Sequence, residues 1–206
     1  MTIPDSVTSI GNSAFFWCDS LTSLTIPSSV TSIGDWAFCG CKSLTSLSIP
    51  KSLTTIEANP FGGLKLQLDN QSPHFYVEDN VLFTADKKRL IAYCSTQTSY
   101  IIPNSVASIG EGAFFDCKSL TSLTVPNSVI SIGDGAFSGC ENLTLLMVPN
   151  SVTSIGDKAF SLCSSLIWLT IPYSVTSMGK GALFGCDNLN RSTREELRDR
   201  FGDQIF

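Results

Sequence analysis

Short stretches in which apolar and hydroxyl side chains alternate recur along most of the chain. In LTSLTIP, residues 21–27, Leu24 and Ile26 alternate with serine and threonine. A period of two predicts a short β-strand whose aliphatic side chains face inward and whose hydroxyls lie on an open face. Pro27 follows at once, and because proline has no N–H to donate, it predicts the end of the strand.

The residues after the proline predict the rest of one coil. In SVTSIG, Val30 and Ile33 are placed to face inward from a second short extended segment. Gly34 marks a tight turn or a close approach of two backbones, because glycine has no Cβ. The segment AFCGC then returns Phe38 and Cys41 to the interior through a turn or a single helical turn.

The same unit is repeated with a fixed period. The prolines that end the strands are 23 residues apart within two groups, namely Pro4, Pro27 and Pro50, and then Pro103, Pro126, Pro149 and Pro172. A fixed period of this length predicts a solenoid, in which each unit buries its apolar side only against its neighbours. Seven copies can be counted, and stacking them would join the strands into one parallel sheet.

One region breaks the period. From Pro50 to Pro103 is 53 residues, which is two periods plus seven residues. The segment NPFGGLKLQL is placed to complete the third coil, with Pro60 in the position of the alanine and Leu64 in the position of the cysteine. The array is therefore interrupted, and it resumes afterwards.

Two β-rich runs follow in the interrupted region, at residues 81–84 and 89–93, around the polar sequence ADKKR. They predict a β-hairpin that projects from the side of the solenoid. We expect an irregular coil with this hairpin insertion at about residues 60–100. The basic residues 87–89 form its tip, which is interpreted either as a solvated hairpin end or as an anion-binding site.

The final sequence, STREELRDRFGDQIF, predicts a short amphipathic helix. Thr193 followed by Glu196 fits a capping box at its start. Leu197 and Phe201 share one helical face, and Gly202 suits the C-cap. We expect this helix to close the last coil, because terminal repeats of a solenoid need a polar lid.

These patterns predict a solenoid over residues 1–190 and a capping helix over residues 191–206. No comparable lid precedes the first coil, where Met1 leads almost directly into Pro4. The first coil is therefore expected to present an open edge, through which the chain could form homo-oligomers, or to indicate a fragment.

The repeat LTSLTIPSSVTSIGDWAFCGCKS, residues 21–43, is similar to that of the BspA-like, or Treponema pallidum-type, leucine-rich repeat family. The resemblance covers residues 3–190. It implies a leucine-rich-repeat solenoid, a curved right-handed coil with a parallel β-sheet on its concave face and short extended or turn segments on the other side. It also implies a surface or secreted protein that takes part in adhesion and binds a protein or glycoprotein partner.

Charge and hydropathy narrow the classes of function. Thirteen Lys and Arg against eighteen Asp and Glu give a net charge of −5, which argues against nucleic-acid binding. No apolar run reaches the length of a membrane span, so no membrane insertion is expected. The start MTIPDSVTSIG lacks the basic and apolar regions of a signal peptide, so the chain is expected to be either intracellular or a fragment of a longer one.

Six of the eight cysteines occupy one repeat position: Cys18, Cys41, Cys117, Cys140, Cys163 and Cys186. We expect a ladder of buried, reduced thiols, because cysteine is often buried and side chains that run parallel fit disulfide geometry poorly. Cys39 and Cys94 lie outside this ladder. One Cys-x-Cys and a single histidine, His74, give only a weak metal signal, so no metal site is predicted.

The sequence contains no motif that predicts catalysis. A phosphate-binding Walker loop, GxSxG and HExxH are all absent, and His74 lies in the irregular segment. The acidic residues after the repeat glycines, such as Asp35, Asp134 and Asp157, are interpreted as solvated turn residues. We therefore expect no catalytic residue and no cofactor.

The outward strand positions change character along the chain. One row across the strands reads Ser23, Ser46, Ser122, Leu145 and Trp168, and the next reads Thr25, Ser48, Thr124, Met147 and Thr170. Both rows begin with hydroxyls and become apolar toward the C-terminus, and exposed clusters of Trp, Tyr, Met and Leu are typical of binding hot spots. The predicted partner-binding residues are Leu145, Met147, Asn150, Trp168, Thr170 and Tyr173.

Two alternatives stay open for this cluster. The C-terminal helix could fold back over it, or it could form a homo-oligomer contact. Trp17 and Trp36, which also depart from the repeat, are expected to pack on the lateral surface of their own coils. The predicted function is a non-enzymatic protein-interaction module of adhesin type; the alternatives are a structural spacer or self-associating scaffold with an inert face and, third, an enzyme.

Overall fold

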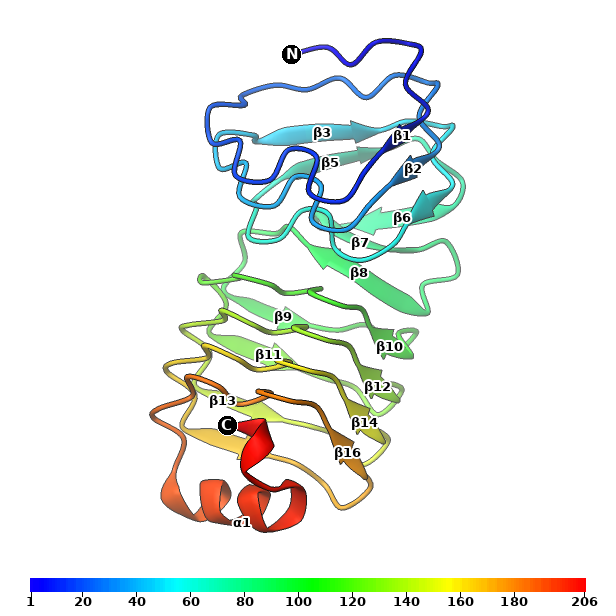
Figure 1. Ribbon diagram of the computed structural model, residues 1–206. Coiled ribbons are helices and arrows are strands. Elements are labelled where there is room, and N and C mark those ends of the chain that lie inside the picture. Colours follow the sequence, from blue (N-terminus) through cyan, green and yellow to red (C-terminus); the bar gives the residue numbers. More distant parts are fainter. The chain divides into compact units, whose positions relative to one another are not determined.

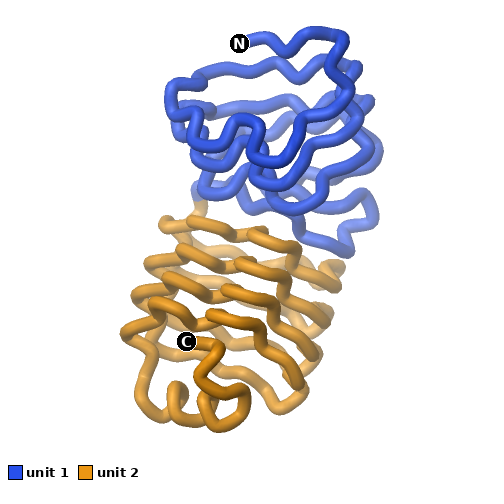
Figure 2. The backbone as a smooth tube through the Cα atoms, in the orientation of Figure 1, with its two compact units in different colours: residues 1–96 blue, residues 97–206 orange.

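The computed structural model describes residues 1–206, which form two compact units, residues 1–96 and residues 97–206 (Figure 2). Within each unit the chain winds through stacked coils of short strands joined by turns (Figure 1). The predicted leucine-rich-repeat solenoid is confirmed in each unit by parallel strands whose paired residues lie one repeat apart.

Residues 97–206 contain two series of short strands. One series carries the strands before the repeat prolines, β9 (Ser99–Ile101), β11 (Ser122–Thr124), β13 (Leu145–Met147) and β15 (Trp168–Thr170). The other series lies in the SVTSIG segments and comprises β10 (Ser108–Ile109), β12 (Ser131–Ile132), β14 (Ser154–Ile155) and β16 (Ser177–Met178). Parallel pairs link β9 to β11, β13 to β15, and each of the four shorter strands to the next.

Residues 1–96 repeat this arrangement with fewer coils. The shorter strands are β1 (Ser9–Ile10), β2 (Ser32–Ile33) and β4 (Thr55–Ile56), which form one parallel sheet. The longer strands β3 (Ser46–Ile49) and β5 (Gln67–Asn70) pair in parallel. Phe38 N donates to Pro60 O at 2.8 Å, just as Phe15 N donates to Ala37 O at 2.7 Å, so Pro60 stands in the alanine position, as predicted.

The interrupted region forms three antiparallel strands, β6 (Phe75–Glu78), β7 (Val81–Thr84) and β8 (Arg89–Tyr93). The two predicted strands are confirmed, and β6 was not predicted. The expectation that the hairpin projects from the solenoid is wrong, because Leu82 and Ile91 are buried in the same core as Phe61. Its strands read as nearly continuous apolar runs, VLF and LIAY, a pattern that indicates burial on both faces.

Stacked phenylalanines form the centre of each unit. Ring centroids of Phe15 and Phe38 are 5.3 Å apart, and those of Phe114 and Phe137 are 5.2 Å apart. The stack continues to Phe160 at 5.6 Å. Because these rings stack on the equivalent rings of adjacent coils, the core extends along the stack rather than around one centre.

The cysteines of the repeat position connect coils through their thiols. Cys140 Sγ donates to Phe114 O at 3.2 Å, and Cys163 Sγ donates to Phe137 O at 3.1 Å. Burial raises the pKa of Cys140 to about 12, so this thiol is neutral at pH 7. Five members of the predicted ladder are buried, whereas Cys18, in the first coil, is exposed.

The glycine of SVTSIG allows two backbones to approach closely, as predicted for Gly34. A Cβ on Gly156 would lie 2.5 Å from Asp134 N and 2.7 Å from Gly133 C, in the previous coil. The following aspartates also connect coils, since Asp134 Oδ1 accepts a hydrogen bond from Asp157 N at 2.8 Å. Asp134 and Asp157 are exposed turn residues, as predicted, and their carboxylates have the additional role of binding the next coil.

The C-terminal segment contains α1 (Arg191–Phe201) and a short 3₁₀-helix, η1 (Asp203–Ile205), beside the last coil (Figure 1). Gly202 ends α1 as predicted, with its N–H donating to Arg198 O at 2.8 Å. The predicted capping box is wrong: the N-cap is Asn190, whose Oδ1 accepts from Thr193 N at 2.9 Å. Asparagine caps helices about as well as serine or threonine. The N-cap therefore lies at Asn190, three residues before the predicted Thr193.

The segment after α1 completes the last coil by copying the backbone of a further coil. Phe160 N donates to Ala182 O at 2.9 Å, and Leu183 N donates in the same way to Ile205 O at 2.6 Å. Gly181 N likewise donates to Gln204 O at 2.7 Å. Ile205 is fully buried. The polar lid predicted for the last coil is thus a helix together with the tail that follows it.

Candidate functional site

The strands β13 and β15 present large apolar side chains on one exposed face. Leu145 and Met147 are 47% and 63% exposed, while Leu146 between them is buried. On β15, Trp168 is 57% exposed, and it lies opposite Leu145 in the parallel register. Adjacent strands are about 4.8 Å apart, so these side chains form one continuous apolar surface.

A groove of about 800 Å³ lies on this face. Its lining includes five of the six predicted partner-binding residues, namely Leu145, Met147, Asn150, Thr170 and Tyr173. Trp168 stands beside Leu145 and outside the groove lining. The structure therefore brings the predicted residues together on one face, with the groove at its centre and Trp168 at its margin.

Tyr173 forms the rim of the groove and is held there by the capping helix. Tyr173 is 85% exposed, and the guanidinium of Arg200 lies 4.8 Å from the centroid of its ring. Arg200 also donates to Ile171 O at 2.7 Å and to Pro172 O at 2.8 Å. The rim therefore has a defined position before any partner is present.

The alternative that the C-terminal helix covers the apolar cluster is wrong. Glu196 of α1 lines one side of the groove, while Met147, Trp168 and Tyr173 stay exposed. The helix borders the surface and leaves it open.

The sequence-based reasoning did not identify three residues of this surface. Ile101 on β9 is 71% exposed and lies in the same outward row as Met147, with Thr124 of β11 between them. Counting back from Pro103 in the repeat frame would have placed it there. Glu196 and Arg200 were not identified, because no repeat pattern indicates how a terminal helix is oriented.

In residues 1–96 the equivalent sheet face is polar. Ser48 Oγ donates to Asp69 Oδ2 at 2.9 Å, and Gln71 Nε2 donates to the same oxygen at 3.2 Å. These side chains satisfy one another, and no large apolar residue is exposed on β3 or β5. The apolar character of the sheet face is specific to residues 97–206.

The basic tip of the hairpin is engaged within its own unit. Lys87 Nζ lies 3.5 Å from the ring centroid of Tyr76, and Arg89 Nη2 donates to Glu57 O at 2.7 Å. Hydrogen bonds from Thr84 Oγ1 and the Lys88 backbone lower the pKa of the Asp86 carboxyl. Two of the three cations therefore have internal partners, which favours the solvated hairpin end over an anion site.

Trp17 contacts its own and the next coil, in line with the packing expected for it. Its ring lies against Gly40, and Lys42 Nζ is 4.5 Å from the ring centroid. Trp17 is nevertheless more than half exposed. Its φ of 57° is left-handed, as is the φ of Gly40 at the same repeat position.

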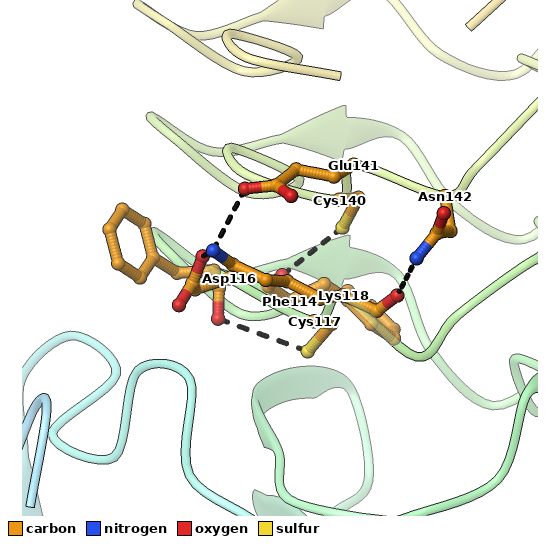
Figure 3. A network of polar contacts seen from close by, with 8 residues as sticks. Phe114, Asp116, Cys117, Lys118, Cys140, Glu141 and Asn142 are labelled. Atoms are coloured by element: carbon orange, nitrogen blue, oxygen red, sulfur yellow. Dashed lines mark hydrogen bonds and ion pairs between the residues drawn. The ribbon is translucent and has the colours of Figure 1, made fainter. Parts of the chain in front are cut away.

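Polar side chains gather densely around Lys118, as Figure 3 shows. Lys118 Nζ lies 2.8 Å from Glu141 Oε1 and 3.4 Å from Asp116 Oδ1, and its pKa is raised, chiefly by the hydrogen bond to Glu141. Asn142 Nδ2 donates to Lys118 O at 2.7 Å. These contacts join adjacent coils, and the neighbouring Cys140 is a neutral, buried thiol. The network is therefore structural, since it offers no thiolate nucleophile.

No group of three or more His, Cys, Asp and Glu side chains is placed to hold a metal ion. The one α-helix, with eleven residues, is too short and too polar to cross a membrane. The groove is lined by apolar side chains, hydroxyls, the amides of Asn127 and Asn150, and one carboxylate, that of Glu196.

Known structures resemble the chain over most of its length. A leucine rich cell surface protein from Faecalibacterium prausnitzii A2-165 is 30% identical, with a TM-score of 0.75 over 98% of this chain and 62% of its own. The pneumococcal vaccine antigen PcpA is also 30% identical, with a TM-score of 0.82 over 92% of this chain and 49% of its own. A leucine-rich repeat protein of T. pallidum is 28% identical, with a TM-score of 0.52 over 97% of this chain and 81% of its own.

The chain thus spans less than two thirds of the length of the first two of these proteins. No curated protein sequence matches it. Six copies of the repeat described as BspA type Leucine rich repeat region match residues 1–74 and 87–206. With the solenoid coils and the repeat register described above, this match identifies the chain as a member of the BspA-type leucine-rich repeat family.

Proposed function

We propose that the chain is a non-enzymatic protein-interaction module of a cell-surface or secreted protein, which binds a protein or glycoprotein partner. The binding surface is the face of β13 and β15 with its groove, formed by Leu145, Met147, Asn150, Trp168, Thr170 and Tyr173. The observation that carries this proposal is the exposure of four large apolar side chains on adjacent strands and their rim.

The energetics of this surface support a binding role. Burying one large apolar side chain contributes about 1.5–3 kcal/mol, so covering Leu145, Met147, Trp168 and Tyr173 would contribute several kcal/mol. Tyr and Trp are enriched among the residues that dominate binding energy. In most other coils the same positions carry serine, threonine or asparagine, so the fold itself does not require these apolar residues.

Two similar structures support a location at the cell surface. One is a leucine rich cell surface protein of Faecalibacterium prausnitzii and the other is a pneumococcal vaccine antigen. The adhesive role is part of this proposal and rests on the family resemblance of the repeat. A spacer or self-associating scaffold is the alternative, in which a second copy covers the apolar face.

The test compares the wild type with a variant that carries Leu145→Ser, Met147→Thr, Trp168→Ser and Tyr173→Asn. Each new residue is one that other coils carry at the same position, so folding should be preserved. Ile130→Thr is the matched control, because it removes an exposed apolar side chain outside the groove and introduces the residue of the equivalent Thr153.

Binding is measured on immobilised extracellular-matrix proteins and cell-surface glycoproteins, with light scattering to determine mass. We expect the wild type and the control to bind one of these proteins and the groove variant to lose binding. Equal binding by all three proteins would reject this surface. Conversion of an oligomeric wild type to a monomer by the groove variant, without loss of any ligand, would favour the self-associating scaffold.

A further inference from the structure

The groove contains one charged side chain, Glu196, which reaches it from α1. The Glu196 side chain is 51% exposed, and its Oε1 lies 3.1 Å from Arg200 Nη1. No group of this chain donates a hydrogen bond to its Oε2. A carboxylate has about four acceptor positions, so Glu196 retains acceptor capacity beside an apolar groove.

Arg200 does not present its own charge to a ligand in the groove. Its side chain is only 15% exposed. Its guanidinium donates to the carbonyl oxygens of Ile171 and Pro172 and contacts the Tyr173 ring. Arg200 therefore acts as a positioning residue for the rim, and the accessible charge of the groove is negative.

The spacing of the apolar side chains favours an extended ligand. Leu145 and Met147 are two residues apart on β13, a separation of about 6.7 Å, which is also the distance between alternate side chains of an extended segment. A segment lying along β13 could therefore place two apolar side chains against them. The amides of Asn127 and Asn150 at the rim can bond its backbone.

Resting on the proposed function, we infer that the groove binds an extended segment of a partner protein with two alternate apolar side chains followed by lysine or arginine, whose cation pairs with Glu196. Charge complementarity supports this choice of partner. Residues 97–206 carry ten acidic and seven basic side chains, a net charge of −3, so a basic segment is attracted and an acidic one repelled.

The experiment uses three sets of short acetylated peptides. Each peptide has two leucines separated by one serine, and the sets carry arginine, glutamine or glutamate at successive positions after the second leucine. Binding to the ¹⁵N-labelled full chain is followed through the side-chain amide signals of Asn127 and Asn150, at low and high salt. Neutral oligosaccharides form a fourth set.

Two variants test the role of the carboxylate. Glu196→Gln keeps an oxygen that can accept from Arg200 and removes the charge from the groove. Glu195→Gln is the matched control, because Glu195 precedes it on α1, pairs with Arg191 and does not line the groove. Thermal unfolding verifies that both variants are folded.

We expect the arginine peptides to bind roughly three to ten times more tightly than the glutamine peptides, and the glutamate peptides to bind most weakly. The differences in affinity should disappear in Glu196→Gln and persist in Glu195→Gln. In the wild type they should become smaller at high salt, because salt screens the charges.

Equal affinities for the three sets, or a ranking that survives Glu196→Gln, would overturn the inference. If the peptides still shift the groove signals and Met147→Thr abolishes those shifts, the proposed function stands without its basic ligand. If no peptide shifts these signals, or only the oligosaccharides do, both the inference and the peptide-binding role of the groove fail.

Discussion

Arg200 lies against the ring of Tyr173 while it donates to the carbonyl oxygen of Pro172, the residue before that tyrosine. One side chain of the capping helix therefore fixes both the backbone and the ring at the rim of the groove. Stability of the last coil and geometry of the candidate binding surface depend on the same residue.

Replacing Arg200 by alanine should destabilise the chain by about 2–3 kcal/mol, because the carbonyl oxygens of Ile171 and Pro172 lose a charged donor. The Tyr173 ring should also lose its fixed orientation. Urea unfolding gives the first quantity and NMR relaxation of the ring gives the second. The control is Arg191→Ala, whose exposed ion pair with Glu195 should contribute no more than about 0.5 kcal/mol. Equal effects of the two substitutions would contradict the role of Arg200.

Ile205→Ala should weaken the closure of the last coil by about 2–4 kcal/mol, because it removes a fully buried side chain that anchors the tail. The Leu183 amide, which donates to Ile205 O, should then exchange its hydrogen faster. Gln204→Ala leaves the backbone bond to Gly181 and removes an exposed side chain whose amide donates to Phe201 O at 3.3 Å, so it should change stability little. Unchanged exchange of the Leu183 amide in Ile205→Ala would show that the tail does not close the coil.

Alanine at two equivalent repeat glycines should have opposite outcomes. A Cβ on Gly156 would meet the backbone of Gly133 and Asp134, so Gly156→Ala should cost about 2 kcal/mol or more. A Cβ on Gly11 would have no atom within 4 Å, so Gly11→Ala should stay within about 0.5 kcal/mol of the wild type. Denaturant unfolding measures the free energy of unfolding of both variants. Similar decreases in the two variants would show that close contact between coils is not the reason for glycine at this repeat position.

Thiol reactivity should differ sharply along the cysteine ladder. At pH 8, iodoacetamide should modify the exposed Cys18 in the folded chain and leave Cys140 unmodified. Mass spectrometry of peptides after labelling identifies the modified residues. Labelling of Cys140 at the rate of Cys18 without denaturant would disprove its burial.

The Cys140 thiol also makes the free energy of unfolding depend on pH. Burial raises the pKa of Cys140 from 9.0 to about 12, so the folded chain holds this proton more tightly than the unfolded chain. Its contribution to stability is therefore fully present below about pH 9 and decreases as the pH rises from 9 toward 12, by up to about 1.4 kcal/mol per pH unit. Cys140→Ala should flatten that part of the stability curve, and an unchanged slope would exclude this residue as its source.

The repeat itself made much of the fold predictable. Alternation and the fixed spacing of the prolines predicted the later strands, their parallel register and the outward rows, because each coil follows the same packing rule. Two expectations were wrong: LTSLTIP itself forms only an isolated bridge at Thr25, and the strands before the prolines pair in separate two-stranded sheets rather than in one sheet. The pairing of Leu145 with Trp168 follows directly from a period of 23 residues. The strands at residues 81–84 and 89–93 were visible as β-rich runs.

What the sequence did not reveal lies where the repeat ends or is interrupted. The apolar runs VLF and LIAY indicate that the hairpin is buried, but no repeat pattern shows that Leu82 and Ile91 pack in the core of the preceding coils. The position of Glu196 at the groove depends on how α1 docks, which is decided by the contacts of Arg200 with the backbone of the last coil. The hairpin and α1 both lie outside the repeat, so the equivalent residues of other coils do not predict their contacts.

The tail that follows α1 binds the last coil through the backbone N–H groups of Gly181 and Leu183, and each preceding coil of residues 97–206 offers the same two donors to its successor. This terminus therefore recognises a feature common to every coil and makes few demands on the side chains of any one of them. An array closed in this way can gain or lose whole repeats by duplication or deletion while its end still fits. The number of strands in the array, and with it the area of a binding surface, can then vary among related chains while the same backbone contacts cap the last coil.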